Sequence, residues 1–272
     1  MRTAYIAGQR NRLQRRGRHE WGTWFERCRG RGRAAGWLVR CGAALLAVSA
    51  TLLTAKSACA QETVFDVPSA DIFDKGKVYF EQDGTVRPVD PFATFTPRLV
   101  VGIGHGIEVG VNFDGPSAPT VGEMDVAPTI KWMAWKGAAS GWTSGWSFYT
   151  GDDVQFPVRQ RTYNAGNYFY AAIAKEWKHG TRVTAGGYDF TKHVVAEANR
   201  AGGQFTIEQA VSKRVTVAAE WYTGNHAVGY VNPGMIVKIT PKWTGYFAYQ
   251  MGNAGVTKGN HQFLWELGYN FN

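Results

Sequence analysis

Phe263-Leu-Trp-Glu-Leu-Gly-Tyr-Asn-Phe271, next to the C-terminus, alternates between two kinds of side chain. Large apolar residues fall on one face of an extended chain, namely Phe263, Trp265, Leu267, Tyr269 and Phe271. Glu266, Gly268 and Asn270 fall on the other face. Because successive side chains of a strand point to opposite sides, this period of two predicts a strand with one apolar and one polar face.

The same period recurs along the chain from residue 75 onward, and no long helical period is found after Gln61. Between Ile107 and Phe113, for example, branched and aromatic residues alternate with Glu108, Gly110 and Asn112. The pattern predicts strands over residues 76–82, 93–103, 107–113, 127–135, 142–150, 167–177, 181–189, 204–211, 215–222, 230–240, 244–251 and 262–271.

The connections between these strands alternate in length. Short connections lie at 104–106, 136–140, 178–180, 212–214 and 241–243, and longer ones at 83–91, 114–125, 151–164, 190–202, 223–229 and 252–261. Tight turns at one end and long loops at the other are typical of bacterial outer-membrane barrels, whose tight turns face the periplasm. We therefore predict an all-β fold, an antiparallel transmembrane β-barrel of about 12 strands (range about 10–14), with a soluble barrel or sandwich as the alternative.

Residues 1–60 differ in composition from the rest of the chain. They hold 12 of the 30 basic residues but only Glu20 and Glu26 among the acids. Gly42–Ala55 is an apolar run too short to anchor a helix in a bilayer, and Ala58-Cys59-Ala60 comes after it. This order predicts a basic leader and signal peptide over 1–60, cleaved near Ala60, with 1–35 as an extension from a start assigned too far upstream. Export places the mature chain in the outer membrane of a Gram-negative bacterium.

The chain beyond the leader excludes several classes of protein. The last 212 residues carry a net charge of −1, so a nucleic-acid-binding surface is not expected. All three cysteines precede Gln61, which excludes disulfide scaffolds and cysteine-ligated zinc. No close histidine pair occurs, and Asp152-Asp153 falls in the expected 151–164 loop as a solvated acidic turn. We expect neither a metal site nor a cofactor.

Residues 61–74 precede the first expected strand, and the barrel occupies 75–272. The few apolar residues of 61–74 cannot form a domain. Two arrangements remain open: the stretch hangs in the periplasm, or it folds into the lumen as a partial plug.

Strand alternation also assigns side chains to the two faces of the barrel. The residues expected to line the lumen are Arg98, Glu108, Asn112, Lys131, Glu208, Glu220, Lys238 and Glu266. Charges inside a barrel are costly unless they are paired or hydrated. They either form salt-bridged struts that fill a narrow lumen, or line an aqueous path and set its ion selectivity. Interfacial aromatic girdles are expected from Trp132, Trp142, Trp177, Trp221, Phe263, Trp265, Tyr269 and Phe271, which contact outer-membrane lipid.

Two stretches resemble known families. Phe263-x-Trp265-x-Leu267-x-Tyr269-x-Phe271 looks like the C-terminal signal read by the barrel-assembly machinery, which implies that machinery as a partner, although Asn272 comes after the last aromatic residue. The hairpin from Arg98 to Phe113 resembles a family of small outer-membrane proteins linked to meta-pathway phenol degradation and of outer-membrane transporters. This resemblance implies passage of small, hydrophobic or aromatic molecules.

We therefore expect a porin-like barrel that passes small molecules without a chemical step. One alternative is a non-conducting structural or ligand-binding barrel. The other is a lipid-modifying outer-membrane enzyme. The histidine-serine motif of the outer-membrane phospholipase has no equivalent around His226 or His261, so we do not expect an enzyme.

Overall fold

A computed structural model describes residues 62–271 except 90–91, 119–123, 138–144, 159–164 and 198. The predicted leader and its cleavage site, together with Trp142, therefore lie outside the described residues. Among the residues that are described, no helix is long and apolar enough to cross a membrane.

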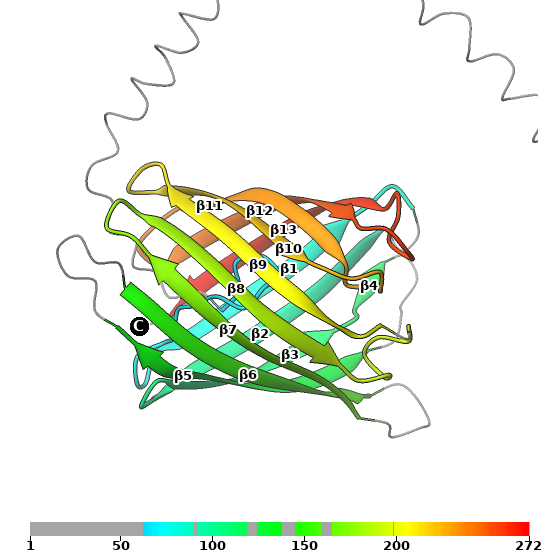
Figure 1. Ribbon diagram of the computed structural model, residues 1–272, viewed down its shortest axis with the longest axis horizontal. Coiled ribbons are helices and arrows are strands. Elements are labelled where there is room, and N and C mark those ends of the chain that lie inside the picture. Colours follow the sequence, from blue (N-terminus) through cyan, green and yellow to red (C-terminus); the bar gives the residue numbers. More distant parts are fainter. Residues whose placement is uncertain are drawn as a thin grey trace, which may run out of the picture. The chain divides into compact units, whose positions relative to one another are not determined.

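The described chain is built from antiparallel strands (Figure 1). The strands are β1 (Val78–Val86), β2 (Ala93–Gly104), β3 (Ile107–Asp114), β4 (Ser117–Ala118), β5 (Asp125–Lys136), β6 (Gly145–Pro157), β7 (Gly166–Glu176), β8 (Thr181–Phe190), β9 (Ala201–Ala210), β10 (Val215–Tyr222), β11 (Tyr230–Lys238), β12 (Trp243–Gly252) and β13 (His261–Asn270).

Twelve of these strands form one closed sheet. Each pairs with its neighbours in the sequence, β1 also pairs with β13, and the two-residue β4 pairs only with β2. The closing seam runs from Tyr79 opposite Asn270 to Val86 opposite Phe263. Closure leaves none of the twelve with an unpaired edge, which is the condition for a sheet to cross a lipid bilayer. The predicted fold class is confirmed.

The two faces of the barrel differ in chemistry. Large apolar side chains are exposed on the outer face of nearly every strand, among them Phe113, Ile130, Phe148, Phe169, Ile173, Ile207, Val217, Met235 and Phe247. A soluble protein rarely exposes so much contiguous apolar surface, because water would drive it to associate. The inner face instead carries buried polar and charged side chains such as Glu108, Lys131 and Glu220.

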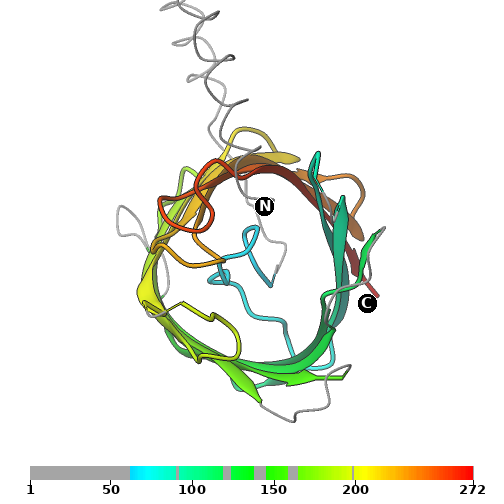
Figure 2. The ribbon, with the colours of Figure 1, turned by 90° about the vertical axis from the view of Figure 1, so that its right-hand side faces the viewer.

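Residues 62–74, the inner segment, run inside the barrel rather than along its wall (Figure 2). The segment turns sharply at its start, where the Val64 amide donates to the Val67 carbonyl at 2.8 Å and Thr63 pairs with Pro68. The chain then leaves the interior and enters β1 at Val78.

Some expected strand boundaries are wrong. β1 runs to Val86 rather than to residue 82, and β6 runs to Pro157 rather than to residue 150, while its expected start at residue 142 lies outside the described residues. Asp152 and Asp153 therefore belong to a strand and not to an acidic turn, because the pairing of β6 with β5 and β7 extends past the last large apolar residue. The expected short connection over 136–140 lies mostly outside the described residues.

Candidate functional site in the barrel lumen

Glu220, on the inner face of β10, holds the turn of the inner segment. Its carboxylate accepts the backbone amides of Phe65, Asp66 and Val67 at 3.0, 2.8 and 3.0 Å. Asn232 of β11 donates to the same carboxylate at 2.6 Å. A buried turn has amides that no strand can satisfy, and one carboxylate satisfies three of them here.

The Asp66 side chain accepts from the same Asn232 of β11 and extends the contact to one further strand, β12. Asn232 donates to its Oδ2 atom at 2.8 Å, and Gln250 of β12 donates to the same atom at 2.5 Å. Burial raises the pKa of Asp66, opposed by nearby Arg98 and by the two amide hydrogen bonds.

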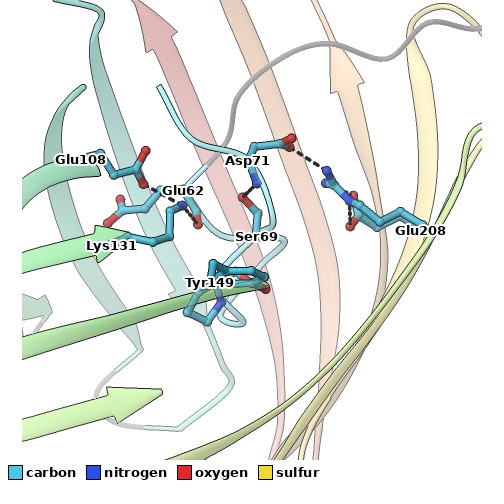
Figure 3. A network of polar contacts seen from close by, with 9 residues as sticks. Glu62, Ser69, Asp71, Glu108, Lys131, Tyr149 and Glu208 are labelled. Atoms are coloured by element: carbon cyan, nitrogen blue, oxygen red, sulfur yellow. Dashed lines mark hydrogen bonds and ion pairs between the residues drawn. The ribbon is translucent and has the colours of Figure 1, made fainter. Parts of the chain in front are cut away.

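A second set of contacts fixes both ends of the inner segment against β3 and β5, and Figure 3 shows the contacts among Glu62, Glu108 and Lys131. Lys131 forms an ion pair with Glu108 at 2.6 Å and donates to the Glu62 carbonyl at 3.2 Å. The other oxygen of Glu108 accepts the Phe73 amide at 2.9 Å. Burial, opposed by Arg98 and Lys131, raises the pKa of the Glu62 side chain to about 7.

The opposite side of the inner segment is held by Arg182 and Tyr149. Arg182 binds Glu208 through two parallel hydrogen bonds of 2.7 Å and pairs with Asp71 at 2.9 Å. Tyr149 donates to the Pro68 carbonyl at 2.6 Å (Figure 3). Strands β6 and β8 therefore contact the segment through a phenolic and a charged group, and Glu208 of β9 binds the same Arg182 side chain.

Apolar packing and close backbone approach complete the fit. Phe65 is fully buried in a cluster with Ile236, Tyr246 and Leu264, and Phe73 stacks on Tyr79 with ring centroids 5.0 Å apart. A Cβ atom on Gly102 would lie 2.3 Å from the Phe73 and Asp74 carbonyl oxygens. Glycine at this position lets the inner segment approach β2.

A cavity of about 280 Å³ lies between the inner segment and the barrel wall. Glu62, Thr63 and Asp66 form one side, and Asp114 and Asp153 bring carboxylates from β3 and β6. Tyr168, Tyr170, Phe190 and Tyr222 form an aromatic wall, in which Tyr168 stacks on Phe190 at 4.7 Å. The cavity thus offers negative charge next to aromatic faces.

The structure distributes the residues expected to line the lumen as follows. Glu108, Lys131 and Glu220 contact the inner segment directly, and Glu208 reaches it through Arg182. Arg98 pairs with Asp83 at 2.7 Å, and Asn112 and Glu266 are buried. Lys238 is half-buried at the end of β11, next to a short turn.

Sequence reasoning missed several interior charges. The alternation places Asp83 in a loop because it ends the first strand too early, and it does not single out Glu81. Arg182 could have been found, because it shares its face of β8 with the buried Thr184. No pattern in the sequence points to Asp66 or Asp71, because apolar and polar residues do not alternate along the inner segment.

The expected girdle residues lie on strands or next to strand ends, and their places along the strands put each one near the short turns, near the long loops or between the two. Trp132, Trp177, Tyr269 and Phe271 lie toward the short-turn end, and Trp221 and Phe263 toward the long-loop end. Trp265 lies midway along β13, and its ring covers Gly84 of β1 across the closing seam.

His226, in the 223–229 loop, is buried against the aromatic residues at the loop end. Its Nε2 atom lies 2.7 Å from the Tyr188 hydroxyl, and its Nδ1 atom accepts the Val228 amide at 3.3 Å. Neither partner is a serine nucleophile of the kind that lipid hydrolases use. The described residues therefore give no positive evidence for catalysis.

A closed antiparallel barrel with an apolar outer face and a charged interior is a transmembrane β-barrel, the class that spans bacterial outer membranes. No family model matches this sequence, and no curated protein matches it.

Solved structures of outer-membrane barrels resemble it at low identity. A KdgM porin is 10% identical with a TM-score of 0.49, over 71% of this chain and 98% of that one. KdgM porin in complex with disordered oligogalacturonate is 9% identical, with a TM-score of 0.47, over 72% and 98%. Outer membrane phospholipase A from Escherichia coli is 12% identical, with a TM-score of 0.43, over 74% and 94%. Likenesses this distant say nothing of what this barrel binds or carries.

Proposed function

We propose that this protein lets small molecules pass through its lumen, past an inner segment that narrows the path. The observation that carries the proposal is the cavity of about 280 Å³ between the segment and the wall. A cavity lined by charged side chains can hold water and small solutes, whereas a lumen filled with apolar side chains cannot.

The charge of the interior suggests which solutes pass. Carboxyl groups outnumber basic groups on the inner face and the inner segment: Glu62, Asp66, Asp71, Glu81, Asp83, Glu108, Asp114, Asp153, Glu208, Glu220 and Glu266 against Arg98, Lys131, Arg182 and Lys238. Rings of carboxylates favour cations and repel anions. The aromatic wall adds faces on which a ring or an organic cation can lie. Cations and neutral aromatic molecules are therefore the preferred solutes.

The family resemblance supports the proposed role, and the predicted leader supports the proposed location and orientation of the barrel. The hairpin between Arg98 and Phe113 supports a transporter-like role. Export through a signal peptide cleaved near Ala60, and assembly by the barrel-assembly machinery, would place the short turns in the periplasm.

The test is electrical recording from the purified, folded protein in a planar bilayer under a salt gradient. We expect discrete conductance steps and a reversal potential that reports cation selectivity. Asp153→Asn removes a carboxylate from the cavity wall and should lower the selectivity, whereas Lys213→Gln, in an exposed turn, should not. Preference for anions would contradict the proposed solute class.

The alternative is a barrel that binds a ligand without conducting. The aromatic wall of Tyr168, Tyr170, Phe190 and Tyr222 is the observation that favours it. Protein that is folded by heat-modifiable gel mobility, and yet passes no current in the same recordings, would support this alternative and overturn passage.

A further inference from the structure

Three carboxylates meet on the inner face at the seam where the barrel closes. Glu81 and Asp83 lie two residues apart on β1, and Asp83 is directly opposite Glu266 of β13. One carboxylate oxygen from each lies within 4.8 Å of the others. All three residues are buried, with exposed fractions of 0%, 7% and 1% for Glu81, Asp83 and Glu266.

Protein groups satisfy only part of this cluster. The Tyr79 hydroxyl donates to Glu81 Oε2 at 2.5 Å, and Arg98 pairs with Asp83 Oδ2 at 2.7 Å. Among the described residues, Glu81 Oε1, Asp83 Oδ1 and both oxygens of Glu266 have no hydrogen-bond donor. Glu266 is therefore a buried carboxylate that lies close to two others and receives no hydrogen bond from the described residues. Such an arrangement costs free energy unless a cation or protons are bound.

We propose that Glu81, Asp83 and Glu266 bind a hard divalent cation of the Ca²⁺ type. Ca²⁺ takes carboxylate oxygens at roughly 2.3–2.6 Å, so two oxygens on one ion lie at most about 5 Å apart. The three oxygens are within that limit. The charges also balance, because one divalent cation and the Arg98 guanidinium together offset three carboxylates.

The position of the site implies a structural role for the cation. It would join β1, the first strand, to β13, the last, and so close the barrel at its seam. A protein that binds a cation only when folded is stabilised by it, so the barrel should become more stable as the cation is added. This inference is independent of the proposed passage of solutes, since the cation would bind the wall of either a conducting or a non-conducting barrel.

The test uses the purified, folded full barrel, stripped with a chelator and titrated with Tb³⁺ and then Ca²⁺. Tyr79 contacts Glu81 and lies 3.2 Å from Tyr246, hydroxyl to hydroxyl, so excitation of these rings should sensitise Tb³⁺ luminescence. We expect Ca²⁺ to displace Tb³⁺ and to raise the thermal unfolding temperature.

Glu266→Gln decides between a cation site and shared protons. For a cation site, the variant should lose at least about tenfold in affinity for Tb³⁺ and lose the Ca²⁺-dependent rise in unfolding temperature. It should still fold, because the amide removes one of three repelling charges. Asp189→Asn, an exposed carboxylate at the end of β8, should behave as the wild type. Sensitised luminescence that is absent, or equally strong in Glu266→Gln, would overturn the proposal.

Discussion

At the scale of single residues, Glu220 holds the turn of the inner segment. One buried carboxylate accepts three consecutive backbone amides, of Phe65, Asp66 and Val67. Hydrogen bonds to a charged group are worth more than neutral ones, and amides left unsatisfied in the interior cost free energy. This side chain should therefore decide whether the inner segment stays in place.

Glu220→Ala should destabilise the folded barrel by about 3 kcal/mol, because buried amides lose their acceptor. The inner segment should also become open to added protease. Denaturant unfolding in lipid vesicles and mapping of the cleavage sites measure the two effects. Glu220→Gln keeps one acceptor oxygen and should fall between Glu220→Ala and the wild type. Unchanged stability and protection in Glu220→Ala would contradict this assignment.

His226 should make the stability of the long-loop end depend on pH. Burial against Tyr188 and Phe190 lowers the pKa of the imidazole, and the nearby charge of Glu197 opposes that shift. The folded loop therefore favours neutral histidine, whereas the opened loop takes up a proton below its ordinary pKa of about 6.5. Stability of the loop should fall as the pH drops through that value.

Hydrogen exchange of residues 223–229, corrected for intrinsic rates, measures this effect. Protection should decrease between about pH 7.5 and about pH 5 in the wild type. It should stay level in His226→Gln, which cannot take up a proton there. Protection that increases on acidification would show that the sign of the pKa shift is wrong.

At the scale of elements, the inner segment depends on one close approach to β2. A methyl group at Gly102 would meet the carbonyl oxygens of Phe73 and Asp74 at 2.3 Å, so the segment must move if the position is filled.

Gly102→Ala should cost roughly 1–3 kcal/mol by overpacking and should speed exchange of the Phe73 amide, which donates to Glu108. Gly187→Ala is the matched control, because the nearest atom to its added methyl group would be 3.7 Å away. Equal effects of the two substitutions would show that the close approach of the inner segment at Gly102 does not cause the loss of stability.

Strands were predictable from the sequence where both faces follow the alternation. Ile107–Phe113 and Phe263–Phe271 are examples, since lipid outside and polar groups inside impose opposite chemistry on successive residues. The end of β6 was misplaced because Asp152 and Asp153 interrupt the apolar face, and pairing with the neighbouring strands carries β6 on to Pro157. The inner segment has no period, so its path is set by contacts with distant strands that alternation cannot show.

The lumen was predictable only in part for the same reason. Alternation put Glu108, Glu220 and Glu266 on the polar face of their strands. Their partners depend on register and on the inner segment: three backbone amides for Glu220, Lys131 and an amide for Glu108, and two carboxylates for Glu266. A period of two predicts on which face of a strand a side chain lies, but it does not predict which residue of another segment that side chain contacts.

At the scale of the whole molecule, the barrel combines a lipid-compatible outer face with an interior that residues 62–74 occupy in part. Contacts from β3, β5, β6, β8, β10, β11 and β12 hold the inner segment, so no single strand determines its position. The path for solutes should therefore depend on whether this segment is docked.

The most direct measurement is single-channel conductance with the inner segment tethered and then released. Asp66 and Asn232 lie within hydrogen-bond distance, at 2.8 Å, and the chain has no cysteine after residue 61. Asp66→Cys with Asn232→Cys therefore places two thiols that a short, reductant-cleavable cross-linker can join, which tethers the segment to β11. We predict a small conductance in the cross-linked barrel that rises several-fold when reductant is added, and no response to reductant in the wild type. The same conductance before and after reduction, or none in either state from a folded barrel, would contradict the account.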